Sequence, residues 1–200
     1  MIAIIDYGAG NIFSVKNALD YLGVENKLTA DKNEICAADE IILPGVGAFP
    51  WAMKMLRDSG LVDTIRGEAR KKPFLGICLG MQLIFDKGYE FEETDGLRLI
   101  GGKVEKIDRK DMIIPHMGWN ELEINRDCPI LKSLPEHPYV YFVHSYAAVC
   151  DEANVSAYCD YGGKITALVH DGAYVYGAQF HPEKSGEVGL QMLRNFAELA

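Results

Sequence analysis

Two hydrophobic patterns alternate along the first 86 residues of the chain. Short, continuous apolar runs, typical of strands covered on both faces, predict strands at residues 2–5, 24–28, 40–43 and 73–77. Apolar residues recur at helical spacing over residues 12–22, 51–57 and 61–72. Asn11 is placed to cap the first of these helices and Gly23 to end it. The alternation predicts an α/β fold in which a mostly parallel sheet carries helices on both faces.

The pattern changes in the second half of the chain. From about residue 99 to residue 179, short β-type segments are separated by Pro, Gly and Asp, which favours antiparallel or mixed strands. These segments are residues 102–107, 139–143, 155–158, 164–170 and 173–180. Residues 187–199 have the spacing of a final amphipathic helix. No internal repeat or linker interrupts the chain, so residues 1–200 are expected to form a single domain.

The composition fits a globular protein and narrows its function. The 200 residues are 48% hydrophobic and 24% charged, enough to bury a full core. A net charge of −9 disfavours a nucleic-acid-binding surface. Five cysteines without C-x-x-C spacing indicate neither a disulfide framework nor a zinc site. No signal-peptide pattern or membrane-length apolar run is found, so a cytoplasmic location without membrane attachment is expected.

The strongest chemical signal is the sequence Gly-Ile-Cys-Leu-Gly at residues 76–80, which joins a buried strand to a helical pattern. Small residues two positions before and after a nucleophile, at a strand-to-helix turn, define a nucleophile elbow. The helix N-terminus would favour the thiolate form of Cys78, and the N–H of Leu79 would be one donor to an oxyanion. The alternative is a structural cysteine buried beside packing glycines.

His181 is the best candidate for the proton partner that a thiolate requires. The sequence His-Pro-Glu at residues 181–183 follows a predicted strand. Proline stiffens the turn there, so the carboxylate of Glu183 is placed to orient the imidazole. A triplet of this kind is by itself more often a surface turn. The pairing with the cysteine elbow favours function, because both segments end strands of an α/β sheet, where sites gather.

Two glycine-rich loops are further candidates for binding sites. The loop Pro-Gly-Val-Gly-Ala-Phe at residues 44–49 exposes backbone N–H groups that suit a phosphate or an oxyanion equally well. The loop at residues 8–13 resembles half of a dinucleotide-binding fingerprint, but Phe13 stands where the third glycine is required. Nucleotide binding is therefore not expected.

Taken together, these motifs resemble the class I, or triad-type, glutamine amidotransferases. The elbow and the His-Pro-Glu triplet mark that class. Four further segments resemble the glutaminase subunits of imidazole glycerol phosphate synthases, enzymes of histidine biosynthesis. They are Asp-Tyr-Gly-Ala-Gly-Asn at 6–11, Pro-Gly-Val-Gly-Ala-Phe at 44–49, His-Met-Gly-Trp-Asn at 116–120 and Phe-Val-His-Ser-Tyr at 142–146. The six motifs occur in the family's order and span nearly the whole chain.

The resemblance implies a flavodoxin-like α/β core with added antiparallel β-structure, L-glutamine as substrate, and no metal or organic cofactor. It also implies a heterodimer with a (βα)8-barrel cyclase subunit that receives the ammonia and makes imidazole glycerol phosphate and AICAR. By position, it assigns these roles: Cys78, His181 and Glu183 as the catalytic triad; Leu79 and Val46 as oxyanion donors; Gly47, Gln82, Glu90, Ser145 and Tyr146 as glutamine ligands; and Tyr141, Met117 and Trp119 as residues facing the partner.

The implied reaction is hydrolysis of the glutamine side-chain amide through a thioester on Cys78, with His181 moving the proton. Three alternatives remain open at this point: a class I amidotransferase serving a different synthase, a non-catalytic interaction module with a retired site, and a cysteine peptidase or related hydrolase.

Overall fold

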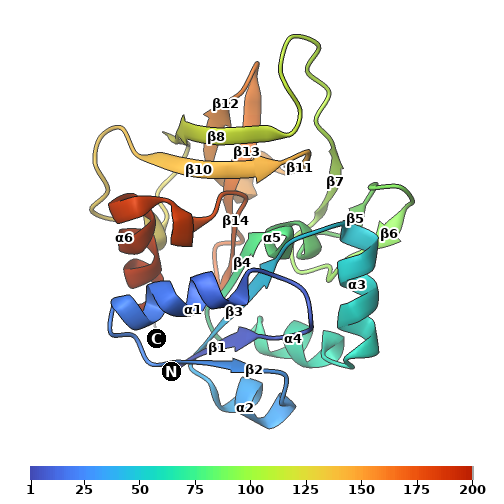
Figure 1. Cartoon of the computed structure of the whole chain (residues 1–200), viewed down its shortest axis with the longest axis vertical. Helices are drawn as coiled ribbons and strands as arrows, with labels where there is room; N and C mark the ends of the chain where they lie inside the picture. The colour runs from blue at the N-terminus through green and yellow to red at the C-terminus, as the bar shows by residue number, and fades with distance from the viewer. Residues whose placement is uncertain (200) are drawn as a thin grey trace.

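A computed structural model describes residues 1–199 of the chain, and its main element is an eight-stranded sheet (Figure 1). The strand order is β2-β1-β3-β4-β14-β13-β12-β9. The first five strands in this order run parallel, and the last three join them antiparallel. Their bounds are β1 Ile2–Ile5, β2 Asn26–Thr29, β3 Glu40–Gly45, β4 Phe74–Cys78, β9 Glu123–Ile124, β12 Val155–Asp160, β13 Lys164–His170 and β14 Val175–Ala178.

Helices cover both faces of the parallel part of this sheet. They are α1 Ile12–Tyr21, α2 Lys32–Ala37, α3 Phe49–Asp58, α4 Val62–Glu68, α5 Leu79–Leu83 and α6 Gly186–Ala197. Ile2 and Ile4 of β1 belong to one hydrophobic core with α1 and α6, whereas Ile5 belongs to a second core with α2, α3 and α4. Since alternate side chains of a strand point to opposite faces, the two cores lie on opposite sides of the sheet. The predicted fold class is confirmed.

Two smaller β units, an antiparallel ribbon and a mixed sheet in which only β5 and β7 pair parallel, are added to the core, in the upper part of Figure 1. Strands β8 (His116–Glu121) and β10 (Tyr139–His144) form a two-stranded ribbon. A four-stranded sheet has the order β11-β7-β5-β6, with bounds β5 Lys87–Gly88, β6 Thr94–Asp95, β7 Gly102–Lys106 and β11 Tyr146–Cys150. Short 3₁₀ helices occupy Pro129–Leu131, Glu152–Asn154 and Pro182–Lys184.

The strands and helices predicted from the sequence are present, with bounds that shift by a few residues. The helix predicted at residues 61–72 is shorter, because α4 ends at Glu68. Asn11 is at the N-cap position of α1, but its side chain accepts from Ser14 Oγ and makes no hydrogen bond to the helix backbone. Helix α2 and strands β5, β6, β8, β9 and β11 were not predicted.

Among the described residues no helix is long and apolar enough to span a membrane. The five cysteines of the chain are free thiols in the structure. Over residues 1–199, no group of three or more His, Cys, Asp or Glu side chains is arranged to hold a metal ion.

Candidate active site

A cavity of about 350 Å³ lies where strands β3, β4 and β14 end. All of the predicted catalytic, oxyanion and substrate-binding residues line it except Glu183. The lining residues are Val46, Gly47, Cys78, Leu79, Gln82, Glu90, Pro115, Val143, His144, Ser145, Tyr146, His181 and Lys184. The carboxyl ends of parallel strands are where sites form in α/β folds, so both topology and side chains favour this cavity.

Cys78 is the last residue of β4 and directly precedes α5. Its φ of 55° lies in the left-handed region, a strained conformation for a residue with a side chain. The flanking glycines make the turn possible. A Cβ at Gly80 would lie 1.8 Å from the carbonyl oxygen of Leu43, and one at Gly76 would lie 2.6 Å from that of Gly80. The segment therefore has the strained strand-to-helix turn expected of a nucleophile elbow.

The Cys78 sulfur is mostly buried and has two polar neighbours. Sγ lies 4.0 Å from the carbonyl oxygen of Val143, and Nε2 of Gln179 lies 4.0 Å from Sγ. Gln179 was not selected from the sequence. It was read only as part of a predicted strand.

His181 reaches the same cavity from the neighbouring strand. Strands β14 and β4 run parallel with Ala178 opposite Ile77, so the residues that follow β14 lie beside the elbow. His181 Nδ1 lies 2.7 Å from Oε1 of Glu183, and the two side chains are 3% and 1% exposed. Because Glu183 occupies Nδ1, the other ring nitrogen, Nε2, is left for proton exchange in the cavity.

The electrostatic surroundings of His181 favour its protonated form. Burial alone lowers the pKa of the imidazole, but the Cys78 sulfur and the Glu183 carboxylate oppose it, and together they raise the pKa of His181 to about 9. An imidazolium next to the cysteine is the partner a thiolate needs.

Ser185 fixes the backbone of His181 and was also missed from the sequence. Its hydroxyl donates to the His181 carbonyl at 2.6 Å and accepts from the Tyr141 N–H at 3.0 Å. The His181 N–H in turn donates to the carbonyl of Tyr141. The segment that carries the imidazole is thereby attached to strand β10.

The glycine-rich loop after β3 is packed tightly at Gly45 and exposed at Val46 and Gly47. Gly45 pairs with Cys78, and a Cβ there would lie 2.7 Å from the N–H nitrogen of Gly80. The Tyr7 hydroxyl donates to the carbonyl of Pro44 at 3.2 Å. Gly47, by contrast, has a φ of 95° and open space around it, and Val46 is 44% exposed. The loop is therefore held up to Gly45 and exposed from Val46 onward.

The predicted glutamine ligands line the cavity, and some of them are held by hydrogen bonds within the protein. Gln82 is buried, and its Nε2 donates to the Tyr146 carbonyl and to Oε1 of Gln179, both at 3.0 Å. Its carbonyl oxygen is the part of this amide left for a substrate. Glu90 accepts from the N–H of Phe49 at 2.8 Å, at the start of α3. Ser145 and Tyr146 line the opposite wall.

His144 lines the cavity and connects it to the β8–β10 ribbon. Its Nδ1 donates to the carbonyl of Tyr146 at 2.8 Å, and its Nε2 lies 3.0 Å from Nδ1 of His116. Nε2 of His116 lies 2.8 Å from Oδ1 of Asn120. Burial is the main cause that lowers the pKa of His144 to about 4, and it also lowers the pKa of His116. The His144 imidazole is therefore structural and neutral at pH 7.

The burial of His144 should make the fold sensitive to acid. Between pH 6.5 and about 4 the unfolded chain binds a proton that folded His144 rejects, so this contribution is complete above pH 6.5 and is lost as the pH falls. The free energy of unfolding should decrease by up to about 3 kcal/mol across this window. Urea denaturation at several pH values measures the slope. His144→Gln should flatten it, whereas His137→Gln, at an exposed position, should not. An unchanged slope in His144→Gln would assign the acid sensitivity to other groups.

The residues predicted to face a partner lie on the outer face of the ribbon. Met117 and Trp119 of β8 are 60% and 53% exposed. Tyr141 of β10 is half-buried, pairs with Trp119 and makes an edge contact with its ring at 6.1 Å between centroids. Met117 and Trp119 therefore lie on the surface of the chain and not in its core.

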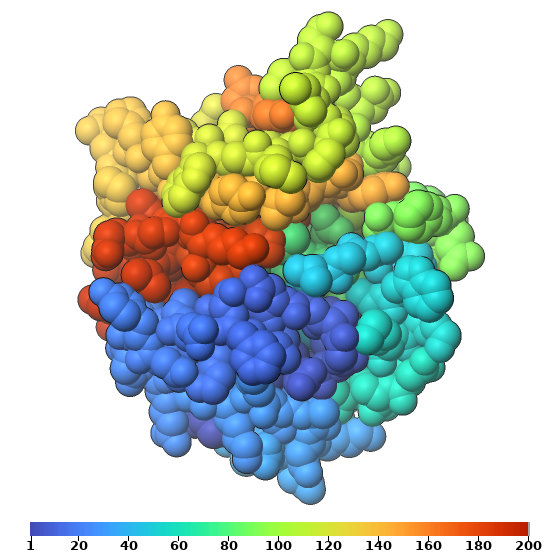
Figure 2. All heavy atoms as spheres, viewed as in Figure 1, coloured from blue at the N-terminus to red at the C-terminus, as the bar shows by residue number. Residues whose placement is uncertain are grey.

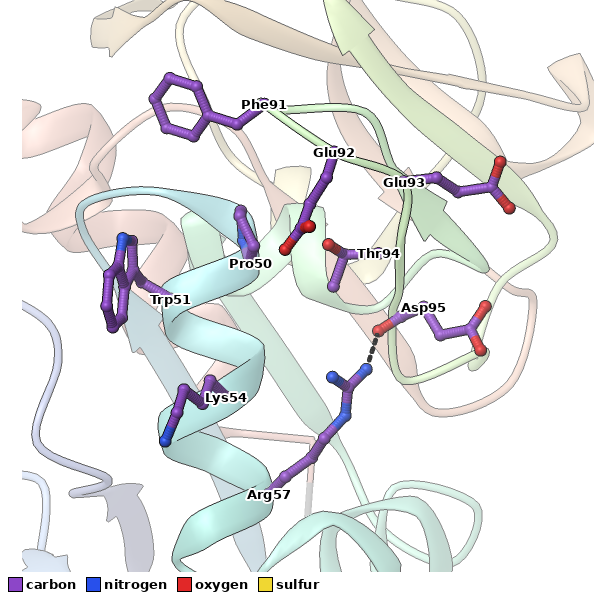
Figure 3. A pocket seen from close by; sticks show the side chains of 9 residues that line it. All are labelled: Pro50, Trp51, Lys54, Arg57, Phe91, Glu92, Glu93, Thr94 and Asp95. Atoms are coloured by element: carbon purple, nitrogen blue, oxygen red, sulfur yellow. Dashed lines mark hydrogen bonds between the residues drawn. The ribbon is translucent and has the colours of Figure 1, made fainter.

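A second, larger cavity of about 840 Å³ lies between α3 and the segment that follows Glu90 (Figure 3). Trp51, Lys54 and Arg57 line it from the helix, and Phe91 and Asp95 from the facing segment. Arg57 donates to the carbonyl of Asp95 at 2.7 Å. No predicted site residue lines this cavity, so its size does not make it the better candidate.

Comparisons with known proteins agree with the geometry. The model of the glutamine amidotransferase class-I family matches residues 3–199. The imidazole glycerol phosphate synthase subunit HisH of Bacillus cereus (strain G9842) is 50% identical over 197 residues, which cover 98% of this chain and 93% of that protein. The HisH subunit of Listeria monocytogenes serotype 4a (strain HCC23) is 48% identical over 201 residues, with 100% and 96% covered.

Solved structures resemble the whole fold at low sequence identity. A crystal structure of a glutamine amidotransferase matches with a TM-score of 0.77 at 23% identity, covering 100% of this chain and 98% of the other. The structure of PurLQS from Thermotoga maritima matches with a TM-score of 0.75 at 22% identity, covering 98% and 97%. These likenesses concern the fold alone.

Proposed function

This chain belongs to the class-I glutamine amidotransferases, in the family of the imidazole glycerol phosphate synthase subunits HisH, and we propose that Cys78, His181 and Glu183 form its catalytic triad. It is a glutaminase subunit of that synthase and acts in histidine biosynthesis. The observation that carries the proposal is the meeting of a strained cysteine elbow with a buried His–Glu pair in one cavity.

The proposed reaction begins with attack of the Cys78 thiolate on the carboxamide carbon of L-glutamine. The C–N bond then breaks, and His181 gives its proton to the departing ammonia, which leaves a glutamyl thioester. Water, deprotonated by His181, hydrolyses the thioester to glutamate and restores the cysteine. Glu183 orients the imidazole through Nδ1 and stabilises its charged form.

The backbone around the elbow would stabilise the negative oxygen of the two tetrahedral intermediates. Leu79 follows the nucleophile directly, so its N–H is fixed by the turn. The second donor would be the N–H of Val46, in the part of the loop that is free to reorient.

The glutamine would lie between the loop after β3 and the wall formed by Ser145 and Tyr146. The carboxamide oxygen of Gln82 and the carboxylate of Glu90 are acceptors suited to its α-ammonium group. A cavity of about 350 Å³ is small enough to favour a free amino acid over a peptide segment. This argues against a peptidase.

We further propose that the ammonia passes to a cyclase subunit with a (βα)8-barrel fold, in a heterodimer. Val143 lines the cavity and pairs with Met117, so the exposed face of the ribbon is continuous with the mouth of the site. Figure 2 shows β8 in yellow-green, α6 in red and α1 in blue on one face of the molecule. An aromatic patch at the mouth of a site suits a partner that receives the product.

The proposal includes a cytoplasmic location and one domain over residues 1–200. Free cysteine thiols support the reducing compartment. The continuity of one sheet from β2 near the N-terminus to β14 near residue 178 supports the single domain.

Trp119→Ala tests the partner surface. Because the indole is half exposed, the variant should keep its melting temperature within about 2 °C, since exposed substitutions away from special features change little. Its affinity for the barrel subunit should fall roughly 30-fold, or about 2 kcal/mol, as at an aromatic interface anchor. Calorimetric titration measures the affinity, and Trp51→Ala, an exposed tryptophan on α3, is the matched control. Loss of the fold without a specific binding defect would contradict the proposed role of Trp119 at the interface.

Glutaminase assays with and without a candidate barrel subunit and its ligand test the proposal as a whole. Release of glutamate and ammonia that rises only with the cyclase of histidine biosynthesis supports it. Activation by another synthase subunit would favour the alternative of a different class I amidotransferase. Failure of Cys78 to react stoichiometrically with a glutamine-analogue electrophile would favour a non-catalytic module.

A further inference from the structure

Gln179 lies beside the nucleophile on the neighbouring strand. The parallel register of β14 and β4 places Ala178 opposite Ile77, so the next residues along the two strands are Gln179 and Cys78. The Gln179 side chain is fully buried, although an amide is costly to bury without partners. Its Nε2 is 4.0 Å from the Cys78 sulfur. The amide is thus placed against the reacting atom and not merely near the cavity.

The orientation of this amide follows from a backbone carbonyl. The oxygen of Tyr146 can only accept, so the group of Gln82 that faces it at 3.0 Å must be the NH₂ group. That NH₂ group also faces Gln179 at 3.0 Å, so Gln179 must present its oxygen to Gln82. The NH₂ group of Gln179 is therefore directed at the sulfur.

The Tyr146 carbonyl, which determines the orientation of both amides, is itself held in place. Besides the hydrogen bond from Gln82, it accepts one from Nδ1 of the buried His144. The side chains of His144, Gln82 and Gln179 thus form one connected set on this carbonyl. Reversing the Gln82 amide would place two acceptors face to face, and reversing the Gln179 amide would place two donors face to face.

We propose that Gln179 donates an N–H group to the Cys78 thiolate and stabilises the nucleophile in its reactive form, a role that rests on the proposed function of Cys78. A donor next to sulfur favours the charged form over the thiol. The contact of 4.0 Å is long, and the negative charge of a thiolate strengthens and shortens such a bond. His181 gives up its proton to ammonia during turnover, whereas an amide keeps its hydrogens. Gln179 therefore remains a donor to sulfur throughout the cycle.

The test is the pH dependence of Cys78 alkylation by iodoacetamide in the full chain, followed by mass spectrometry of the Cys78 peptide. In Gln179→Met, which preserves size and removes the donor, the midpoint of the profile should rise by about one pH unit. Labelling at pH values below the midpoint should then be about tenfold slower and should recover at high pH. Gln82→Met, which removes the group that orients Gln179, should shift the midpoint in the same direction by less.

Asn195→Leu is the matched control. Asn195 is another buried amide, bonded to the carbonyls of Ile130 and Lys132, and it does not line the cavity. It should lower the melting temperature without moving the profile. An unmoved midpoint in folded Gln179→Met, or in Gln82→Met if the first variant does not fold, would overturn the inference. So would labelling slowed equally at all pH values, which indicates access and not ionisation. Labelling does not require turnover, so absence of glutaminase activity in the wild type would instead count against the proposed function.

Discussion

Cys78→Ala should abolish glutamine-dependent turnover of the synthase complex while turnover with ammonium salts persists. The expected loss with glutamine is on the order of 10⁴-fold or more, because removal of a nucleophile leaves only binding and oxyanion contacts. Ammonia-dependent turnover should stay within about twofold, since the cyclase chemistry is proposed to belong to the partner. Steady-state rates of the reconstituted complex with each nitrogen source measure both.

Three further variants define the controls for this result. His181→Ala should resemble Cys78→Ala, and Glu183→Gln should lose less, because an orienting group is partly dispensable. Cys36→Ala, at an exposed cysteine on α2, should change neither activity. An equal loss of both activities in Cys78→Ala would contradict the proposed division of labour between the subunits.

The isolated chain should be a poor glutaminase, and the loaded partner should raise its kcat about 100-fold with little change in KM. The reason is the oxyanion site: the donor from Leu79 is fixed, whereas the donor from Val46 belongs to the Gly45–Val46 peptide, at the boundary between the paired strand and the exposed part of the loop. One missing donor costs roughly 3 kcal/mol, or about two orders of magnitude in rate. Since that contact exists only in the transition state, its gain appears in kcat. Both constants are measured with and without the barrel subunit and its ligand.

Gly47→Ala should reduce the ratio of kcat with the loaded partner to kcat without it. A side chain at this position disfavours the positive φ that Gly47 has in the resting loop. Gly172→Ala is the matched control: it also has a positive φ with open space around it, but it lies in the turn between β13 and β14. A response dominated by KM would reject the loop switch and indicate assembly of the glutamine pocket instead.

The sequence predicted the parallel half of the fold well because those elements are fixed by local signals. Continuous apolar runs identified β1, β3 and β4, and a glycine at the right place ended α1. Strand β8 was missed because its outward residues, Met117 and Trp119, are apolar, so that it lacks the alternation of a strand with one wet face. Helix α2 has six residues and a single buried side chain, too few to show a period.

The site residues also divide into those that local sequence motifs identify and those that only the folded structure brings together. Cys78 and the His181–Glu183 pair stand in short motifs whose chemistry is readable in sequence, and the structure brings them to one cavity region. Gln179, Ser185 and Lys184 carry no such motif. The contacts of Gln179 and Ser185 join residues on different strands and depend on register, which only the folded sheet supplies. Glu90 was selected by position alone, and its bond to the start of α3 could not be foreseen.

The insertion of β14 between β4 and β13 also bears on when the protein becomes active during its synthesis. The proposed nucleophile and the segment after β14 that carries its proposed base are about a hundred residues apart, as the separation of 101 between Cys78 and Gln179 shows. Closing so long a loop is entropically slow, and pairing of distant strands comes late in folding. A nascent chain that has completed β4 therefore holds a cysteine without a proton acceptor. In the proposed mechanism, hydrolysis of glutamine requires translation past His181, so a stalled or cleaved chain that lacks this residue would release no ammonia.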